Sequence, residues 1–532
     1  MDKKHYLYGA AVQGIQNFIF QTNELKDIVG ASELVEAVCT SAFDEFGSDP
    51  SKSIVRAAGN IKYDFDDEEQ CKKAVLEFPK KVQGMAPGIT ISQAVVEYEP
   101  KEPQSQTQVQ GISQAVEKYD QKAEQFSNIV KQLGSFLRIQ RNCPARSNVH
   151  GLIGTRRSRK TGLPAVAIQY NDYLDEPTFK KKERAEKATY NVCEKAFGVN
   201  FVRKYNKKIP FNIGEITKRN NWIAIVHADG NGFGKIFQKV GHDKEKLSVF
   251  SKRVDELTQN AARMAFADIK GEIDEELNTP QCFIPIRPVV LNGDDLTVII
   301  RGDLAIPYAN AFLKNFEKVT ADELQSEFGS GLTACAGVAF IKSSYPFYYG
   351  YALAEDLCAR AKNKAKKLNE DLAPSCLMFH KVQDSFVENY EKIIERELTP
   401  SVGLSFEFGP YFIEIDKQTG YWTVKDLLDS QKKLTGEEGN IIKSHLRKWI
   451  ELLYVPQEDI TNRNNDEVGN GLAEQYLNRF KSLLSDKSLS FSEELTTGRR
   501  DMRVRNHIEK TIKTYPTYDV LALHSIYEVV TK

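Results

Sequence analysis

The chain has 532 residues, of which 41% are hydrophobic and 27% charged, and its formal net charge is −1. This length predicts three or four domains, and the near-zero charge excludes a protein that binds nucleic acid over its whole surface. No segment approaches the about 18 apolar residues of a membrane helix, and the start of the chain has no apolar signal segment. The eight cysteines form no Cys-x-x-Cys pair. We therefore expect a cytoplasmic protein with reduced thiols, without a membrane segment or a zinc ribbon.

The first hundred residues have the pattern of one α+β unit. A strand entering a glycine turn is predicted first, followed by a helix, a hairpin, a second helix and a closing strand. The corresponding segments are residues 6–20, 31–46, 53–65, 66–82 and 88–97. The order βαββαβ is that of a ferredoxin-like domain, which we place at residues 1–100.

Residues 101–215 differ from this unit in composition. A polar linker at 101–110 precedes a long amphipathic helix, predicted at Ile112–Leu137. From Arg141 to Lys208 the chain has sixteen Lys or Arg and six Asp or Glu, a net charge of +10. A solvated basic surface and a surface that contacts the phosphates of RNA or nucleotide explain this segment equally well.

A third region, residues 216–425, begins with an apolar strand that ends at a carboxylate. Trp222 to Ala228 run into Asp229, and glycines follow at 230, 232 and 234. A carboxylate at the end of a strand, followed by backbone that can approach a ligand closely, suits a metal ion that carries phosphate oxygens. An ordinary Asp-Gly turn is the alternative.

The segment Val289–Ile300 predicts a hairpin with carboxylates at its turn. Two apolar arms flank Asn292-Gly293, a strong hairpin signal, and Asp294 and Asp295 follow. Because buried carboxylates are costly without a cation, this hairpin and the Asp229 turn together favour a divalent-metal site over an exposed tip. In a regular strand Asp295 would point away from Asp294, so its place at the site depends on the turn. The sequence offers no nearby lysine or arginine partner, which predicts a cluster of uncompensated negative charge.

The rest of this region completes a second βαββαβ unit. Helices are predicted at 245–269, 305–320 and 349–368, with a strand at 331–341. Lys362 and Lys366 are four residues apart on the last helix, so they share a face, either as a solvated basic surface or as ligands for phosphate. A further hairpin is expected at 404–424. We interpret residues 426–532 as a helical accessory domain without catalytic residues.

These motifs resemble a known family. A strand ending in Asp-Gly-x-Gly and a hairpin close to Gly-Gly-Asp-Asp are similar to the cyclase-type Palm of diguanylate cyclases, and more similar to the large polymerase subunit of type III CRISPR effector complexes. Asn292 stands where that family usually has its first glycine, and asparagine also tolerates positive φ. Three further similarities are Gly14-Ile15-Gln16, Gly30-Ala31-Ser32 and Phe408-Gly409-Pro410-Tyr411.

The resemblance implies two ferredoxin-like Palms, only the second of them active. Setting Gly14 against Gly230 places Gln13 opposite Asp229, and Asn60 falls where the second unit has Asp294; chance similarity of two such units is the alternative. The family often has a zinc module between its Palms, but Cys143 and His150 are the only candidate ligands nearby, so we predict no zinc. No His-Asp pair of a nuclease domain precedes the first Palm, so DNA cleavage is not expected.

The resemblance implies a nucleotidyltransferase that makes cyclic or linear oligonucleotides in antiviral defence, most simply oligoadenylates from ATP, with two Mg²⁺ or Mn²⁺ ions. Asp229, Asp294 and Asp295 are the expected catalytic residues, and with Gly230 the metal ligands. The expected nucleotide-binding residues are Gly230, Asn231, Gly232, Phe233, Gly293, Lys362, Lys366 and Ser32. RNA and other CRISPR effector subunits are the expected partners. A nucleotide-binding scaffold without turnover and a free-standing signalling cyclase remain the alternatives.

Overall fold

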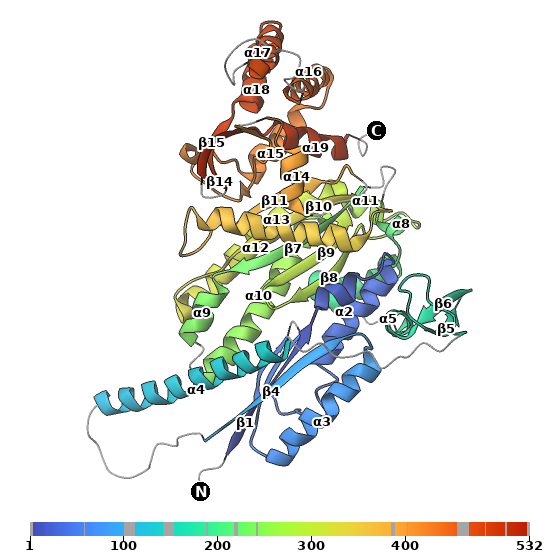
Figure 1. Cartoon of the computed structure of the whole chain (residues 1–532), viewed down its shortest axis with the longest axis vertical. Coiled ribbons are helices and arrows are strands. Elements are labelled where there is room, and N and C mark those ends of the chain that lie inside the picture. The colour runs from blue at the N-terminus through green and yellow to red at the C-terminus, as the bar shows by residue number, and fades with distance from the viewer. Residues whose placement is uncertain are drawn as a thin grey trace.

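The computed structural model describes residues 4–57, 59–99, 112–141, 154–169, 171–187, 190–217, 222–240, 243–384, 389–401, 403–454, 468–484, 486–505 and 508–528. Along the longest axis the first Palm lies at one end, the second Palm in the middle and the C-terminal region at the other end (Figure 1). Within the described residues, no helix combines the length and the apolar character that crossing a membrane requires.

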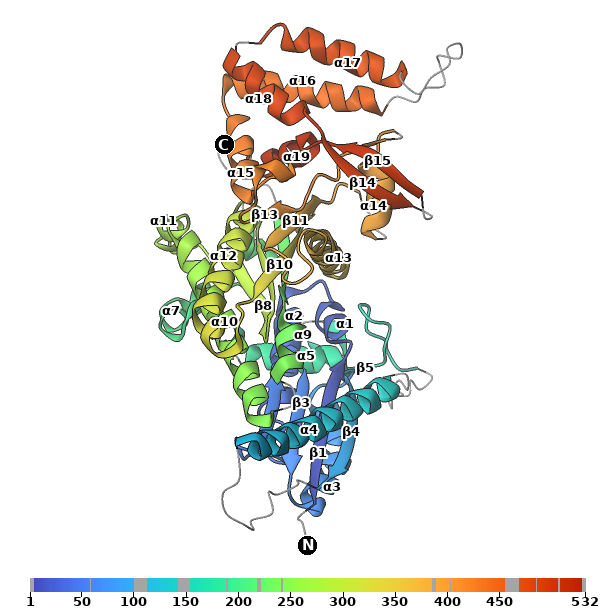
Figure 2. The same ribbon diagram turned by 90° about the vertical axis from the view of Figure 1, so that its left-hand side faces the viewer.

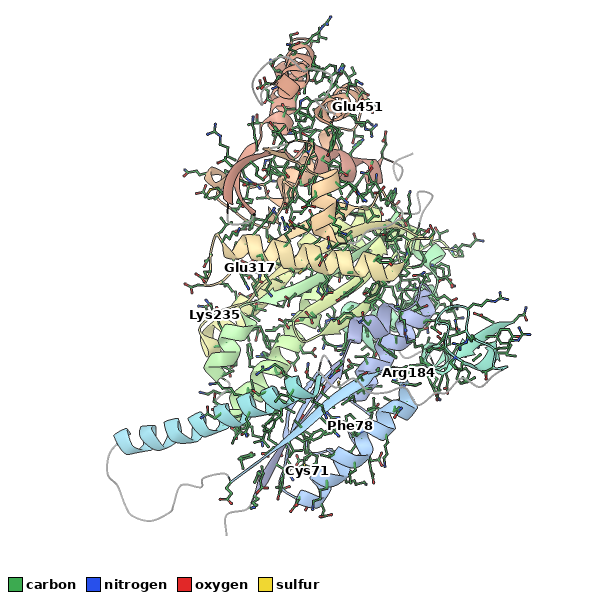
Figure 3. The ribbon with its side chains drawn as sticks, in the orientation of Figure 1. Cys71, Phe78, Arg184, Lys235, Glu317 and Glu451 are labelled. Atoms are coloured by element: carbon green, nitrogen blue, oxygen red, sulfur yellow. The ribbon has the colours of Figure 1, made fainter. Side chains whose placement is uncertain are left out.

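The first Palm has the predicted βαββαβ order with one additional short helix. Its elements are β1 (His5–Gln13), α1 (Ile15–Phe20), α2 (Leu25–Cys39), β2 (Ser53–Ala57), β3 (Asn60–Phe65), α3 (Glu68–Met85) and β4 (Thr90–Tyr98). The strands form an antiparallel sheet in the order β2-β3-β1-β4. Buried aromatic rings fill its core, with Phe43 edge-on to Phe78 at 5.2 Å. Figure 3 labels Phe78 together with Cys71 on α3.

The predicted helix at 31–46 was wrong at both ends, because α2 begins at Leu25 and ends at Cys39. Gly30, which directly precedes the predicted helix, lies inside α2. A Cβ at Gly30 would come 1.8 Å from the backbone oxygen of Lys181. The glycine is there so that α5 can cross α2 closely.

The segment between the Palms packs against both of them. Its elements are α4 (Ile112–Arg141), β5 (Ala165–Gln169), β6 (Asp172–Asp175), α5 (Glu176–Glu186), α6 (Asn191–Phe197), α7 (Val199–Tyr205), η1 (Asn206–Lys208) and α8 (Ile213–Ile216). The predicted amphipathic helix is α4, which lies across β1 and β4 (Figure 2). The linker 101–110 and the pair Cys143 and His150 lie outside the described residues.

The second Palm repeats the first and extends it. Its elements are β7 (Trp222–Asn231), α9 (Phe233–Val240), α10 (Lys244–Lys270), α11 (Asp274–Leu277), β8 (Ile286–Asn292), β9 (Asp295–Arg301), α12 (Gly302–Phe328), β10 (Thr333–Lys342), α13 (Phe347–Lys366), β11 (Cys376–Lys381) and β13 (Tyr411–Phe412). The sheet order is β13-β11-β10-β7-β9-β8. Its part β8-β9-β7-β10 corresponds strand for strand to β2-β3-β1-β4 of the first Palm.

The C-terminal region is mostly helical, as predicted, but the prediction missed a small sheet. Its elements are α14 (Tyr390–Glu397), β12 (Leu404–Ser405), η2 (Lys417–Thr419), α15 (Val424–Lys433), α16 (Glu437–Leu453), α17 (Val468–Lys481), α18 (Asp486–Thr496), β14 (Arg499–Arg505), β15 (Ile508–Thr514) and α19 (Thr517–Tyr527). The strand β14 reads Arg-Arg-Asp-Met-Arg-Val-Arg, so charged side chains hide its alternation. The predicted hairpin at 404–424 was also wrong, since β12 pairs with β15 and β13 pairs with β11.

The two Palms can be aligned by their strand register. Gly14 and Gly232 each have positive φ, +60° and +86°, and each directly precedes a helix. Gln13 therefore corresponds to Asn231 and not to Asp229, and the earlier alignment was wrong by two residues because it matched Gly14 with Gly230. Ala11 takes the place of Asp229.

The hairpins give the same register. Ala57 pairs with Asn60 across the first turn and Asn292 with Asp295 across the second. Asn60 therefore occupies the place of Asp295, one residue from the place that the sequence suggested, and Gly59 occupies the place of Asp294. The prediction that the first Palm lacks all three carboxylates is unchanged by this correction.

Candidate metal and nucleotide site

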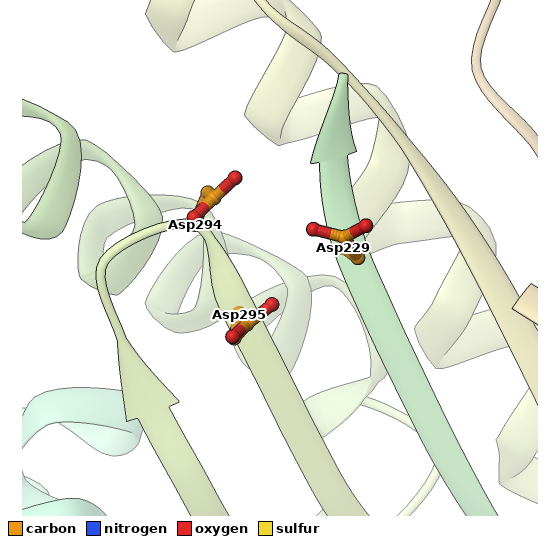
Figure 4. A group of neighbouring side chains, drawn as sticks. All are labelled: Asp229, Asp294 and Asp295. Atoms are coloured by element: carbon orange, nitrogen blue, oxygen red, sulfur yellow. The ribbon is translucent and has the colours of Figure 1, made fainter. Parts of the chain in front are cut away.

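Three carboxylates meet where β7 approaches the β8–β9 hairpin. Asp229 lies near the end of β7, Asp294 in the hairpin turn and Asp295 at the first residue of β9. One carboxylate oxygen of each lies within 4.8 Å of those of the other two. Figure 4 shows the three side chains turned toward the space between the strand and the hairpin. The turn thus brings Asp295 inward, although a regular strand would have pointed it away from Asp294.

The hairpin turn is held by more than its own residues. Gly293 has φ +63°, a conformation that its glycine adopts without strain. Its backbone N–H donates to a carboxylate oxygen of Asp255 on α10, at 2.9 Å. Gly293 was predicted to contact nucleotide, but in the structure its amide is engaged by this helix.

Gly230 provides the space that Asp294 occupies. A Cβ at position 230 would come 2.8 Å from both Cβ and Oδ2 of Asp294. A Cβ essentially never comes this close to an atom to which it is not bonded, so any side chain here would displace the carboxylate. Gly230 therefore has a steric role, and the approach of its backbone to phosphates stays a prediction.

Burial and mutual repulsion make the carboxylates of the hairpin reluctant to ionise. Burial, followed by the charge of Asp229, raises the pKa of Asp294 from 3.8 to about 6. Burial, followed by the charges of Asp294 and Asp229, raises the pKa of Asp295 well above its usual value. A site that destabilises its own negative charge in this way is relieved by a divalent cation.

A lysine compensates one of the three carboxylates, so the prediction of a wholly uncompensated cluster was wrong. Lys362 on α13 donates to Oδ2 of Asp229 at 2.6 Å and to the backbone oxygen of Gly230 at 2.7 Å. Burial alone would lower the pKa of Lys362, but the hydrogen bond to Asp229 and its charge raise it. The two partners are 133 residues apart in sequence, which is why local inspection did not find them.

The helix α13 is fixed near Lys362 by a second ion cluster. Arg360 and Lys364, on either side of Lys362 in sequence, both bind the buried carboxylate of Glu407. Burial acts to raise the pKa of Glu407, but Lys364 and Arg360 lower it to about 2. Lys366 is exposed at the last residue of α13. The two predicted phosphate ligands therefore differ, since only Lys362 touches the carboxylate site.

The remaining predicted nucleotide residues on β7 and α9 have structural contacts. The side chain of Asn231 is buried and donates to Thr333 and to the sulfur of Cys335. Gly232 forms the positive-φ turn, and Phe233 packs on Phe250 with ring centroids 5.2 Å apart.

Ser32 is separated from the carboxylates by a small cavity between the Palms. Its hydroxyl donates to the backbone oxygen of Val289 on β8. A cavity of about 50 Å³ is lined by Ser32 and by Asp295, and also by Gln16, His227 and Tyr351. The structure thus brings Ser32 to the same cavity as Asp295, as a contact between the two Palms.

His227 is a site residue that the sequence analysis missed. It lies two positions before Asp229 on β7, so both side chains are on the same face of the sheet. Its Nδ1 is 3.0 Å from the hydroxyl of Thr297, and burial lowers its pKa to about 4. The alternation of the strand was the signal that could have identified it.

Several cations of the basic segment are engaged by the first Palm. Lys182 pairs with Glu24 and with Asp27, the latter at 2.9 Å, and Lys160 also binds Glu24. Lys181 is buried and donates to the backbone oxygen of Phe18 at 2.6 Å. Lys181 and Lys182 therefore join α5 to the first Palm, and Lys160 makes a further link from outside this helix.

The donor set fits small divalent cations. Three carboxylates with oxygens within 4.8 Å supply the hard oxygen ligands that Mg²⁺ and Mn²⁺ prefer. The missing side chain at Gly230 and the raised pKa values of Asp294 and Asp295 agree with a site built for added positive charge. The residues present thus match the predicted metal.

The comparisons with known proteins agree with this geometry. Residues 222–370 match the family model described as Cas10/Cmr2, second palm domain. The crystal structure of a Csm1-Csm4 cassette in complex with cA4 matches with a TM-score of 0.51 at 13% identity, and one in complex with AMPPNP with 0.54 at 15%. Both alignments cover 100% of this chain and 70% of the other, and at these identities they show the fold alone. No curated protein matches the sequence. Residues 222–370 therefore resemble a second palm domain of the Cas10/Cmr2 type, within a chain whose fold is similar to that of Csm1.

Proposed function

We propose that the protein is a metal-dependent nucleotidyltransferase that joins ATP into cyclic or linear oligoadenylates. The observation that carries the proposal is the convergence of Asp229, Asp294 and Asp295 within 4.8 Å, with Lys362 beside them. Clustered carboxylates that raise one another's pKa destabilise the empty fold, so a function that uses them is favoured over a structural role.

Each carboxylate has a distinct proposed task. Asp229 and Asp294 would be shared ligands of two divalent ions, and Asp295 a further ligand or a partner that orients them. When bound, such ions lower the pKa of a ribose hydroxyl and neutralise charge on a pyrophosphate leaving group. Gly230 would leave Asp294 the room to take part.

Lys362 would bind the triphosphate of the incoming nucleotide. Its ammonium already lies at the site, where it donates to Asp229. When the carboxylate acquires a metal ion, the lysine is free to pair with a phosphate instead, so one cation would serve both states of the site. Lys366 is one helical turn further along α13 and would reach the distal phosphates.

The proposed setting is a type III CRISPR effector complex in antiviral defence. The similar Csm1-Csm4 cassettes contain a Csm4 subunit and were crystallised with cA4 or AMPPNP. By analogy we propose a Csm4-like partner and adenine nucleotides as substrates. We propose RNA as a further ligand from the resemblance in sequence and from the basic segment between the Palms.

A nucleotide-binding scaffold is the second candidate, and one observation favours it. The ion pair between Lys362 and Asp229 compensates one carboxylate without any metal ion. A site compensated in this way can persist in a protein that has no turnover. The two candidates make the same binding predictions and differ in product formation.

Mass spectrometry of reaction products separates the two candidates. Full-length protein would be incubated with each of the four nucleotides and Mg²⁺ or Mn²⁺, with Asp294→Asn as the inactive control. We expect oligoadenylates from the parent only with ATP and a divalent ion. We also expect Mn²⁺ together with a non-hydrolysable ATP analogue to raise the melting temperature of the parent protein by mass action. A melting shift without any oligonucleotide product would support the scaffold and contradict the enzyme.

A further inference from the structure

The β8–β9 hairpin, which carries Asp294 and Asp295, is connected to the first Palm through a lysine of the inter-Palm segment. Lys195 on α6 donates to the side-chain oxygen of Asn292 at 2.9 Å. The same ammonium binds a carboxylate oxygen of Glu36 on α2 at 2.7 Å. One lysine therefore joins three separate parts of the chain: the first Palm, the inter-Palm segment and the turn that carries Asp294 and Asp295.

The contact is largely shielded from water. The side chains of Lys195 and Glu36 are 20% and 15% exposed, and Asn292 is 9% exposed. Hydrogen bonds to a charged group in such surroundings are stronger than exposed ones, and a missing partner would leave Lys195 or Asn292 poorly paired.

The helix α6 is itself held in place from two sides. Asn191 at its start donates to a carboxylate oxygen of Glu33 on α2, at 3.2 Å. The backbone oxygen of Lys195 accepts from Arg263 on α10 at 3.3 Å. At the next residue of the turn, Asp255 of α10 accepts from the amide of Gly293. The hairpin is thus fixed at two adjacent residues, Asn292 through α6 and Gly293 through α10.

We propose that Lys195 is a positioning residue that sets the place of Asp294 and Asp295 through Asn292, and so couples the affinity of the metal site to the first Palm. This inference rests on the proposed function, because it assigns a role in the same site. The proposed coupling depends on the side chain of Asn292, because a glycine at this position would offer Lys195 no side-chain acceptor.

The sign of the effect distinguishes positioning from electrostatics. Lys195 is cationic, so its removal would strengthen divalent-ion binding if the lysine acted only through its charge. If the lysine positions the hairpin, its removal weakens ion binding. Groups that orient metal ligands contribute about 10- to 100-fold to affinity or activity.

The test is a Mn²⁺ titration of the full-length protein by electron paramagnetic resonance, together with the rate of oligonucleotide synthesis. We expect Lys195→Met and Asn292→Gly each to weaken Mn²⁺ binding by about 10-fold or more. The double variant should be no worse than the poorer single variant, because both remove the same contact. Asn292→Gly retains a residue that a tight turn accepts, so it guards against misfolding of the lysine variant.

Lys187→Met is the matched control, since it removes an exposed lysine that pairs with Glu183 on the neighbouring helix α5. It should leave Mn²⁺ affinity unchanged. Folded single variants with Mn²⁺ affinity within two-fold of the parent, or tighter, would overturn the inference. If the parent binds Mn²⁺ but makes no oligonucleotide, the proposed function fails while the titration still tests Lys195. A parent that binds no Mn²⁺ would overturn both.

Discussion

The two Palms have the same strand order, but only the second has the three clustered carboxylates. In both, four antiparallel strands are arranged as β2-β3-β1-β4 or β8-β9-β7-β10, and a glycine of positive φ follows the first strand. The three carboxylates of the second Palm are replaced in the first by Ala11, Gly59 and Asn60. This difference shows that the Palm fold does not depend on the carboxylate site, because the first Palm has the same fold without these charged residues.

The packing around the turn differs in a reciprocal way. In the second Palm, Gly230 has no side chain and Asp294 fills the space beside it. By the same register, the first Palm has Val12 in place of Gly230 and Gly59 in place of Asp294. A Cβ at Gly59 would collide with Cδ1 of Ile15 and would come 3.2 Å from Cβ of Val12. The space beside the turn is thus occupied by Val12 and Ile15 in the first Palm and by Asp294 in the second.

The largest expected effect lies in the carboxylates that only the second Palm has. Asp229→Asn, Asp294→Asn and Asp295→Asn should each lower oligonucleotide synthesis by about 1,000-fold or more, since several kcal/mol of charge stabilisation are lost. Asp294→Asn should also melt at or above the parental temperature, because the variant no longer buries a charge at this position or repels Asp229. Asp229→Asn should not be stabilised, because it loses Lys362. Product assays and calorimetry of the metal-free proteins measure both effects. Parental activity in Asp229→Asn would mean that this carboxylate, which only the second Palm has, is not needed for synthesis.

The next largest effect concerns how each Palm holds the helix after its fourth strand. In the first Palm, Leu133 of α4 packs on Gly9, whereas α13 is fixed by Glu407. Glu407→Gln should lower the free energy of unfolding by roughly 3 kcal/mol at pH 7, because Arg360 and Lys364 lose a buried partner.

The pH dependence of this difference has a defined sign. The pKa of Glu407 is about 2 in the folded protein and 4.5 for the ordinary side chain. Its contribution is therefore complete above pH 4.5 and is lost as the pH falls toward 2. Denaturant titrations of parent and variant between pH 7 and 2 should converge at the acid end. If the difference in the free energy of unfolding between parent and variant stays constant with pH, the ion cluster is not its cause.

A smaller effect is expected from filling the space beside Asp294. Gly230→Ala places a methyl group 2.8 Å from that carboxylate, which must move. Synthesis should fall by about 10- to 100-fold, the range seen when metal ligands are disturbed and not removed. Gly234→Ala is the control, because a Cβ at position 234 meets nothing within 4 Å. Equal activity of the two alanine variants would contradict the steric role of Gly230.

The smallest effect is expected in the first Palm. Gln13→Ala combined with Asn60→Ala should leave synthesis within about three-fold of the parent, because neither residue is a carboxylate of the site or lines the cavity beside Asp295. Gln13 donates to Ser92 on the neighbouring strand, so a modest loss of stability is expected. A loss of synthesis as deep as that of Asp229→Asn would mean that the first Palm takes part in the chemistry.

Local patterns accounted for most of the fold and for the carboxylates. The apolar run into Asp229 and the Asn292-Gly293 turn are short-range signals, and both elements form where they were predicted. The predicted start of α2 fell after Gly30, because the close approach of Lys181 that requires this glycine within the helix comes from a segment 151 residues away. The strands β14 and β15 were missed because charged residues hide their alternation.

The contacts that complete the site could not be read from the sequence. Lys362 meets Asp229 across 133 residues, and Lys195 meets Asn292 across 97. Such pairs depend on how helices lie on the sheet, and no periodicity encodes them. Asn292 itself was judged only by its backbone conformation, and its side chain proved to be the acceptor for Lys195.

The reciprocal packing of Val12 and Gly59 bears on the evolutionary history of the chain. An aspartate introduced at position 59 would collide with Ile15, would crowd Val12, and would also have to adopt a φ of +75°, where non-glycine residues are strained. A glycine introduced at position 12 alone would leave a void. Each single step toward a carboxylate site is therefore destabilising in the first Palm. The packing around this turn thus opposes the acquisition of such a site there by single substitutions.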